Sequence, residues 1–192
     1  MKLNINRKIK GCLIMEFQKC IETRRSIRNF NSKEVSNDII EEIVNAAAYA
    51  PSWKNSQVTR YYAIKDAKVK EAIIEAMPDF NKSSCKSAPV IIVSSVVKFR
   101  SGYTRDGGFD SAKGDGWQMY DCGLSNMIFL LKAKELGLGT VILGIFDEAK
   151  VTEIVGIPNT EEIVSIIPIG YYDEDVAMPK RKFADTILKV IE

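Results

Sequence analysis

The stretch that says most about this chain is APVIIVSSVV, residues 88–97. It is rich in β-branched residues and lacks the alternation of polar and apolar residues that marks a strand with one face in water. A continuous run of this kind predicts a strand that is buried on both faces. Because such a strand needs cover above and below, the stretch predicts a sheet with helices on each side.

Outward from this strand, hydrophobic periodicity and capping residues predict the other elements. Ser36 is placed to cap a helix that Pro51 ends, and Asp66 and Asp147 are placed to cap two later helices. The predicted helices cover residues 16–23, 36–50, 66–77, 117–136 and 147–155, and the predicted strands cover 58–65, 88–97, 140–145 and 162–171. This order predicts an α+β sandwich with a mixed central sheet flanked by helices.

The composition predicts a single soluble globular domain. The chain has 192 residues, of which 46% are hydrophobic and 27% charged, as is usual for a single globular domain. We expect residues 16–192 to form that domain and residues 1–15 to be a loose N-terminal extension. No window approaches the roughly 18 apolar residues of a transmembrane helix, so we expect a cytoplasmic protein with no membrane partner.

Several classes of function are disfavoured by what the sequence lacks. It contains no histidine, and its four cysteines show no CxxC spacing, which argues against zinc sites, redox dithiols and Ser-His-Asp catalysis. The 27 basic residues are nearly balanced by 25 acidic ones, which argues against a nucleic-acid surface. We therefore expect no metal and no nucleic acid, and a chemistry carried by a bound cofactor.

The first candidate site is the basic cluster Arg24-Arg25-Ser26-Ile27-Arg28. Arg24 and Arg28 share a face if the preceding helix continues through them, and Ser26 adds a hydroxyl between them. Guanidinium groups donate bidentate hydrogen bonds to phosphate oxygens, so the cluster suits a phosphate. The alternative is a solvated helix end whose arginines pair with Glu22 or Glu34.

A second basic cluster, Lys180-Arg181-Lys182, lies far from the first in sequence. A basic run of this kind usually lies on the solvated surface. The other interpretation is that both clusters converge on one phosphate, since basic residues are concentrated at these two places in a chain that is close to neutral.

A third candidate is the polar loop Ala50-Pro51-Ser52-Trp53-Lys54-Asn55-Ser56-Gln57, which follows a predicted helix. Its amides and hydroxyls suit the polar edge of a planar ligand, and Pro51 and Trp53 suit its face. The alternative is an ordinary loop after a helix, because Pro, Ser and Asn all favour turns.

The region around residues 98–124 combines a long loop with a long helix. Residues 98–116 contain five glycines and are expected to form a mobile surface loop, with Trp117 as a lid over a site. Alternatively, Trp117 fastens the helix to its own core and Cys122 is a small buried hydrophobe. The predicted apolar face of the helix is broad enough to pack on more than its own sheet, and it consists of Tyr120, Leu124, Met127, Ile128, Leu131 and Leu136, widened by Phe129 and Leu130.

Glycines near residue 140 do not form a dinucleotide-binding motif. Gly137-Leu138-Gly139-Thr140 is not GxGxxG and follows a helix, whereas that motif follows a strand. Gly144, after Leu143 at the end of a predicted strand, would let backbone approach a planar ligand, with its N–H directed at an acceptor.

Together these segments resemble the nitroreductase family of FMN-dependent oxidoreductases from residue 16 to residue 191. The resemblance is carried by the order and spacing of the pieces rather than by any one motif. The matching pieces are Arg24-Arg25-Ser26-Ile27-Arg28, Ala50-Pro51-Ser52 with Asn55-Ser56-Gln57, Lys113-Gly114 through Asp121-Cys122-Gly123, Gly137-Leu138-Gly139-Thr140, Gly144, and Lys180-Arg181-Lys182.

The resemblance implies an intertwined homodimer with two FMN sites at the subunit interface. It implies that the phosphate is held by Arg24, Ser26, Lys180 and Arg181, and the pyrimidine edge of the ring by Arg28. It implies that Pro51, Ser52, Trp53 and Asn55 come from the partner subunit and that Gly144 meets flavin N5. Arg25, Gln57 and Leu143 complete the cofactor-binding residues that we expect, while Arg25 has no specific role.

The activity that the resemblance implies is transfer of hydride from NAD(P)H through FMN to an electron-poor acceptor, such as a nitroaromatic or a quinone, by a ping-pong mechanism. No side chain is then an obligatory catalyst. Val58-Thr59-Arg60 stands where many members carry proline and an aromatic residue, and Phe183 stands at the family's proline position. These departures leave open the acceptor and the phosphate partner among Lys180, Arg181 and Lys182. The alternatives are a dehalogenating or flavin-cleaving enzyme and a flavin-binding redox sensor.

Overall fold

The structure, a computed structural model, describes residues 16–192, so the expected N-terminal extension lies outside the described residues. The elements are α1 (Phe17–Thr23), α2 (Asn37–Ala47), the 3-10 turn η1 (Trp53–Asn55), β1 (Thr59–Ile64), α3 (Ala67–Glu75), α4 (Asp79–Lys86), β2 (Val90–Val97), α5 (Gly116–Glu135), β3 (Gly139–Thr140), α6 (Glu148–Val155), β4 (Glu161–Gly170) and α7 (Ala184–Ile187). The α+β class expected from the sequence is confirmed.

The sheet has four strands in the order β1-β2-β4-β3, and every pairing between these strands is antiparallel. β2 lies inside the sheet, and seven of its eight residues are buried, as residues 88–97 predict. The parallel pairing found among the described residues is a single bridge between Ser26 and Thr140. The four-stranded sheet is therefore antiparallel rather than mixed as expected, and the parallel contact is confined to this bridge from the segment that carries the first basic cluster.

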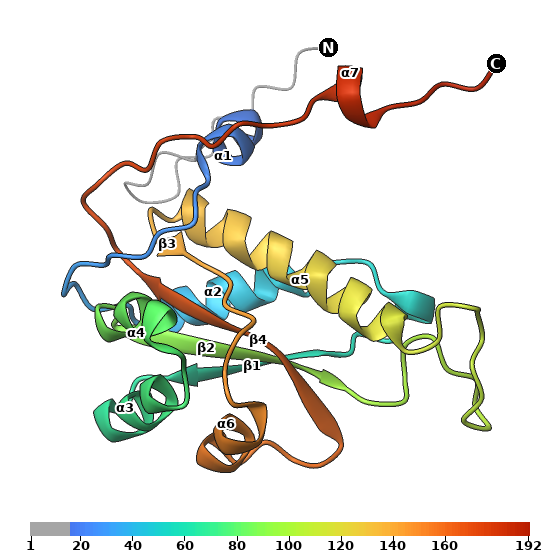
Figure 1. Ribbon diagram of the computed structural model, residues 1–192, viewed down its shortest axis with the longest axis horizontal. Coiled ribbons are helices and arrows are strands. Elements are labelled where there is room, and N and C mark those ends of the chain that lie inside the picture. Colours follow the sequence, from blue (N-terminus) through green and yellow to red (C-terminus); the bar gives the residue numbers. More distant parts are fainter. Residues whose placement is uncertain (1–15) are drawn as a thin grey trace.

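Helices cover both faces of the sheet, as Figure 1 shows. On one face α2 and α5 pack against the sheet around Ile43, Phe129 and Ile167. On the other face α3, α4 and α6 enclose a second core around Ile73 and Val151. The predicted caps are confirmed, because the side chains of Ser36, Asp66 and Asp147 accept hydrogen bonds from backbone N–H groups of α2, α3 and α6.

Three details differ from the sequence-based expectations. α4 was not expected, because its sequence DFNKSSCK is mostly polar. Its buried residues are Ser84 and Cys85. The strand expected over 140–145 is reduced to Gly139–Thr140, and the chain rejoins the sheet through one bridge between Leu143 and Ile166. The helix expected over 36–50 ends at Ala47, before the proline that was expected to end it.

The orientation of α5 also differs from the expectation. The face toward the sheet is largely polar or small, and its buried residues are Gln118, Asp121, Cys122, Ser125, Asn126, Phe129, Leu130 and Ala133. Of the predicted apolar face, Phe129 and Leu130 are buried, whereas Tyr120 is 59% exposed and Met127 is 42% exposed. The polar residues can be buried because serines of the sheet satisfy them, as where the Asn126 amide donates to Ser94 Oγ over 3.2 Å.

The segment after α1 runs along the edge strand β3. Ile27 donates its backbone N–H to the Thr140 carbonyl over 3.0 Å, and the Ile27 side chain is buried. A Cβ on Gly139 would lie 2.6 Å from Ile27 Cγ1 and 2.8 Å from Tyr172. Glycine at this position therefore allows the basic segment to approach the sheet.

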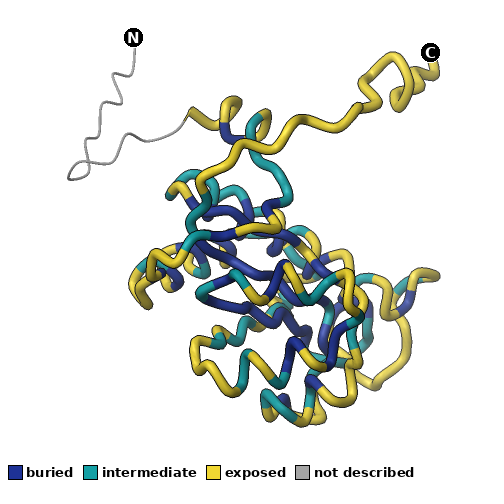
Figure 2. The backbone as a smooth tube through the Cα atoms, turned by 60° about the vertical axis from the view of Figure 1, so that its left-hand side comes forward, coloured by how far each residue is buried: buried dark blue, intermediate teal, exposed yellow. Residues whose placement is uncertain are grey.

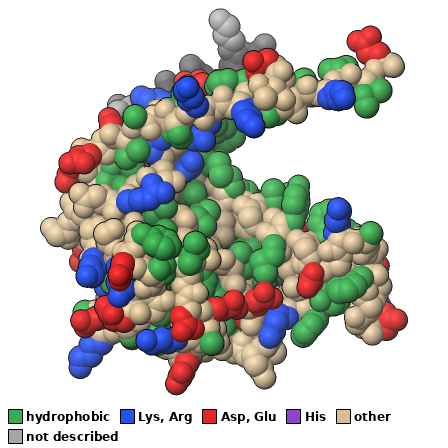
Figure 3. Space-filling view, viewed as in Figure 1, with side chains coloured by type: hydrophobic (Ala, Val, Ile, Leu, Met, Phe, Trp, Pro, Cys, Tyr) green, Lys and Arg blue, Asp and Glu red, His purple; other side chains and the backbone are tan. Residues whose placement is uncertain are grey.

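Residues 173–192 form an arm that leaves the body of the molecule and is exposed throughout (Figure 2). Figure 3 shows a hollow between this arm and the body, with hydrophobic side chains along it. Among the described residues, no helix is long and apolar enough to cross a membrane.

We predict that Gly139→Ala destabilises the protein by about 1–3 kcal/mol, because the added methyl group has no room beside Ile27. Gly144→Ala is the matched control, since a Cβ there meets nothing within 4 Å, and its effect should stay within about 0.5 kcal/mol. Urea unfolding of both variants without added cofactor measures the difference. Equal unfolding free energies would contradict this account of Gly139.

Candidate functional site

The two basic clusters meet at one cavity of about 370 Å³. Arg24 to Arg28 form one wall, and the chain after Val176 forms the other. The lining residues are Arg24, Arg25, Ser26, Arg28, Val176, Ala177, Pro179 and Arg181. The structure thus joins residues that lie more than 140 positions apart in sequence, as the convergence hypothesis expects.

The first cluster reaches this arrangement by a different local structure from the one expected. α1 ends at Thr23, and Arg24 is already extended, so Arg24 and Arg28 do not share a helical face. Side chains alternate between the two sides of an extended chain, which places Arg24, Ser26 and Arg28 on one side. Ile27 points to the other side and is buried.

The guanidinium groups around the cavity have no carboxylate partners within the described residues 16–192, and residues 1–15 contain no Asp or Glu. The alternative in which the arginines pair with Glu22 or Glu34 is not seen, because Glu34 pairs with Lys65. Arg25 instead donates to the carbonyls of Glu22 and Arg24, each over 2.7 Å, and its buried Nε has no acceptor.

Arg24 shows how unfavourable this concentration of positive charge is. The pKa of its guanidinium is lowered, first by burial and next by the positive charges of Arg181 and Arg25. An anion in the cavity would relieve both effects, because it would replace lost solvation and offset the repulsion. The arrangement is therefore suited to bind a phosphate-like group.

The second cluster contributes one of its three residues to the cavity. Arg181 lines it, while Lys180 and Lys182 are exposed and are not among the lining residues. Pro179, Val176 and Ala177 also line it and were not expected from the sequence. The extended run that brings them there carries no periodic pattern that would have marked them.

Gly144 follows the edge strand that binds the first cluster. Leu143 exchanges two backbone hydrogen bonds with Ile166, of 2.8 and 2.9 Å, and this fixes the chain just before the glycine. Gly144 is exposed, has no positive φ and has nothing within 4 Å of an added Cβ. Neither packing nor a positive φ within the described chain requires glycine there.

The polar loop, residues 50–57, is strongly bent and internally hydrogen-bonded. Ser52 Oγ accepts from the Gln57 N–H over 2.9 Å, and the Gln57 amide donates to Asn55 Oδ1 over 3.0 Å. Lys54, Asn55 and Gln57 have φ values of 49°, 53° and 48°. Each non-glycine residue in this left-handed region costs on the order of 1–3 kcal/mol and persists when its surroundings enforce it.

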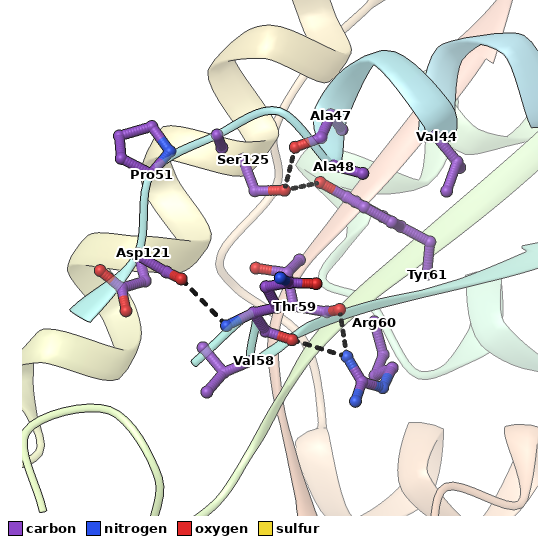
Figure 4. A pocket seen from close by; sticks show the side chains of 13 residues that line it. Val44, Ala47, Ala48, Pro51, Val58, Thr59, Arg60, Tyr61, Asp121 and Ser125 are labelled. Carbon is purple, nitrogen blue, oxygen red and sulfur yellow. Dashed lines mark hydrogen bonds between the residues drawn. The ribbon is translucent and has the colours of Figure 1, made fainter. Parts of the chain in front are cut away.

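A smaller cavity of about 190 Å³ lies behind this loop, between α2, β1 and α5 (Figure 4). In it the Ser125 hydroxyl is 2.9 Å from the Tyr61 hydroxyl and donates to the Ala47 carbonyl over 3.3 Å. Burial raises the pKa of Tyr61, which keeps its hydroxyl protonated. These neutral hydrogen bonds join α2, β1 and α5 behind the loop.

Trp117 packs beside the polar loop rather than over the arginine-lined cavity. Its ring centroid is 4.6 Å from that of Trp53, and its Nε1–H donates to Ser111 Oγ over 2.7 Å. Its neighbour on the same helix, Tyr120, contacts it edge-on. Trp117 thus joins the glycine-rich loop, residues 98–115, to the polar loop.

The two halves of the expected cofactor site lie toward opposite ends of α5 (Figure 1). Near one end, the thiol of Cys20 in α1 donates to the Leu131 carbonyl, and near the other, Trp53 donates its N–H to Asp121. These contacts are about ten residues apart, or about 15 Å of helix. The two halves are therefore separated along α5 within this chain.

Asp121, which the resemblance includes without assigning it a role, lies at this end of the molecule. It is 3% exposed, and its carboxylate accepts hydrogen bonds from Trp53, Ser56 and Ser101. The available signal was the spacing of Gln118, Asp121, Cys122 and Ser125, which places small or polar residues on one helical face. Among the described residues, no group of three or more potential ligands could hold a metal.

We predict that inorganic phosphate raises the thermal unfolding midpoint of the cofactor-free protein, and that Arg24→Gln reduces this rise. An anion that binds the folded state alone stabilises it by mass action, and the variant removes one of the converging charges. Lys33→Gln, an exposed lysine outside the cavity, is the control for the change in net charge. The same response to phosphate in all three proteins would refute an anion site at Arg24.

Comparison with known proteins agrees with this geometry. The family model described as "Nitroreductase family" matches residues 21–171. A protein of Archaeoglobus fulgidus with the provisional name NADH dehydrogenase/NAD(P)H nitroreductase is 29% identical over 160 residues, covering 81% of this chain and 85% of that protein. Iodotyrosine deiodinase 1 of Mus musculus is 24% identical over 203 residues, covering 92% of this chain and 70% of the mouse protein.

Solved structures agree on the fold. A nitroreductase-type protein of Desulfovibrio desulfuricans, solved in complex with FMN, superposes with a TM-score of 0.76 at 22% identity. The match covers 91% of this chain and 96% of that one.

Proposed function

The chain belongs to the nitroreductase family, and we propose that it is an FMN-dependent oxidoreductase that passes hydride from NAD(P)H to an electron-poor small molecule such as a nitroaromatic or a quinone. The observation that carries this proposal is the cavity where four arginines converge without a carboxylate partner among the described residues. The FMN complex of the related Desulfovibrio protein supports the choice of flavin.

The residues present fit the phosphate end of FMN. A phosphate monoester carries nearly two negative charges at neutral pH and offers three acceptor oxygens. Arg24 and Arg181, which line the same cavity, would supply bidentate donors, and Ser26 a neutral one. Lys180 is not among the lining residues, so we propose Arg181 as the phosphate ligand from the second cluster.

The ring end would be held by residues next to the same sheet edge. Arg28 is exposed at the mouth of the cavity and would face the pyrimidine edge. Gly144 would let the backbone approach the ring, and Leu143 fixes that backbone in the sheet. When bound, FMN supplies the two-electron chemistry, since its ring accepts and returns hydride at N5. The chain then has to bind, orient and exclude water, and it needs no histidine.

The partner in this proposal is a second copy of the chain. The polar loop lies near the N-terminal end of α5 and the arginine-lined cavity near its other end, so in this proposal Pro51, Ser52, Trp53, Asn55 and Gln57 would contact the ring bound by the partner subunit. The outer face of α5 and the arm leave apolar side chains exposed that a second copy would cover. The exposed apolar residues of the arm are Val176, Met178, Phe183, Ile187, Leu188, Val190 and Ile191.

Reductive dehalogenation is a second candidate reaction. It is favoured by the relation to iodotyrosine deiodinase 1, which extends over 92% of this chain. Assays of the reduced protein with nitroaromatics, quinones and halogenated phenols separate the two, by the acceptor that reoxidises it fastest.

The first test is whether the purified protein is yellow and is bleached anaerobically by NADH or NADPH. We expect both. A protein that is colourless and does not take up FMN would refute the proposal. A yellow protein that neither nicotinamide bleaches would favour a redox sensor over an enzyme.

We predict that Arg181→Ala weakens FMN binding by roughly 10- to 100-fold, which corresponds to the loss of a charge-assisted hydrogen bond. Lys182→Ala is the matched control, because it removes a charge one residue away that does not line the cavity, and its effect should stay within about threefold. Fluorescence titration with FMN measures both. A larger loss for Lys182→Ala would reverse the assignment.

We predict that Arg28→Ala retains FMN but makes it harder to reduce. A guanidinium beside the pyrimidine edge stabilises negative charge on the reduced ring, and its loss should lower the two-electron potential by about 30 mV for each ~1.4 kcal/mol of lost interaction. A spectroelectrochemical titration compares Arg28→Ala with Lys182→Ala. An unchanged potential in Arg28→Ala would remove Arg28 from the ring site.

A further inference from the structure

The polar loop, residues 50–57, has an unfavourable backbone conformation in spite of its internal hydrogen bonds. Three residues within four positions, Lys54, Asn55 and Gln57, are in the left-handed region of backbone space. Asparagine tolerates that region, but lysine and glutamine are strained there. Such a loop keeps its shape when contacts from outside enforce it.

The contact that enforces it is a buried carboxylate. Asp121 Oδ2 accepts from the Trp53 backbone N–H over 2.9 Å, from Ser101 Oγ over 2.5 Å and from Ser56 Oγ over 3.4 Å. Asp121 is 3% exposed and has no cationic partner among the described residues. A buried carboxylate without a counter-ion depends on its hydrogen-bond donors, and so it holds them in place in turn.

Two further contacts join the same pair of loops. Lys54 forms an ion pair with Asp110, in the loop between β2 and α5. The rings of Trp53 and Trp117 pack together, and Trp117 is hydrogen-bonded to Ser111 of that loop. The polar loop and the glycine-rich loop, residues 98–115, are therefore joined at one buried and two outer points.

We infer that Asp121 is a positioning residue that holds the polar loop in its strained shape and joins it to the glycine-rich loop as one unit. Figure 4 shows Asp121 on α5 beside the chain that runs from Pro51. The consequence for catalysis rests on the proposed function, in which Pro51, Ser52, Trp53 and Asn55 lie against the flavin of the partner subunit. Asp121 then fixes the position of these four residues, which form one wall of the acceptor site, and does not contact flavin or acceptor itself.

The experiment compares Asp121→Asn with Asp115→Asn in the full-length purified protein. Asparagine keeps the size of aspartate but removes the charge and presents N–H groups where the carboxylate accepts. Asp115 is exposed, directly precedes α5 and makes no side-chain capping hydrogen bond, so it controls for the same chemical change nearby. Ser101→Ala is a milder variant that removes one donor and keeps the carboxylate.

The first readout does not depend on flavin. We expect trypsin to cleave after Lys54 about tenfold faster in Asp121→Asn, and the near-ultraviolet circular dichroism of the Trp53–Trp117 pair to weaken. Ser101→Ala should change both in the same direction by less, and Asp115→Asn should resemble the wild type. Wild-type cleavage and dichroism in Asp121→Asn would overturn the inference.

A second-site variant tests the strain itself. Gln57→Gly removes the side chain that resists a positive φ, so it should slow the cleavage of Asp121→Asn toward the wild-type rate. No rescue would show that the loop is not strained in the way inferred.

The second readout separates this inference from the proposed function. In the FMN-loaded enzyme, Asp121→Asn should raise the acceptor KM about tenfold while the rate of reduction by NAD(P)H changes less than threefold. If the loop readouts change but the protein binds no FMN, the proposed function fails and the positioning role stands. If the enzyme is active and the acceptor KM is unchanged although the loop is released, the proposed catalytic consequence is wrong.

Discussion

Strand β2 lies between β1 and β4, and apolar side chains on both of its faces are removed from water. A strand in this position cannot be covered from one side, so α2 and α5 must pack on one face and α3, α4 and α6 on the other. Once both faces are covered, the ends and edges of the sheet remain available. The basic segment uses one such edge by pairing with β3, where Gly139 allows the close approach.

Helix α5 spans the sheet and separates the functional parts of the molecule. Toward its C-terminal end it contacts α1, which leads into the arginine-lined cavity, and toward its N-terminal end it holds the polar loop through Asp121. Its inner face is polar enough to make these attachments, and its outer face keeps apolar residues exposed. The same helix therefore sets the distance between the arginine-lined cavity and the polar loop, and in the proposed dimer its outer face would contact the second copy.

The arginine-lined cavity and the strained loop both place a cost on the folded chain. Like charges are held close together around the cavity, and three residues of the loop occupy unfavourable backbone conformations. Burial of apolar side chains in the cores on both faces of the sheet can offset these two unfavourable contributions, since the net stability of a domain is the small difference between large terms. A ligand phosphate would offset the first cost on binding, whereas Asp121 has to offset the second in the folded chain itself.

The sequence by itself determined the α+β class, the buried strand at residues 88–97, the capped helices and the basic residue types of the arginine-lined cavity, because periodicity, capping and side-chain chemistry are local properties. It did not determine that Arg24 and Arg28 align along an extended chain rather than a helix, or that Arg181, unlike Lys180, reaches the cavity. It also did not determine which apolar residues of α5 pack on the sheet, because hydrophobicity alone does not distinguish Phe129 and Leu130, which are buried, from Tyr120 and Met127, which are exposed. Tertiary structure decided these points, since each depends on which distant segment supplies a hydrogen bond, a charge or an apolar surface, as the serines of the sheet do for Asn126 and Ser101 does for Asp121.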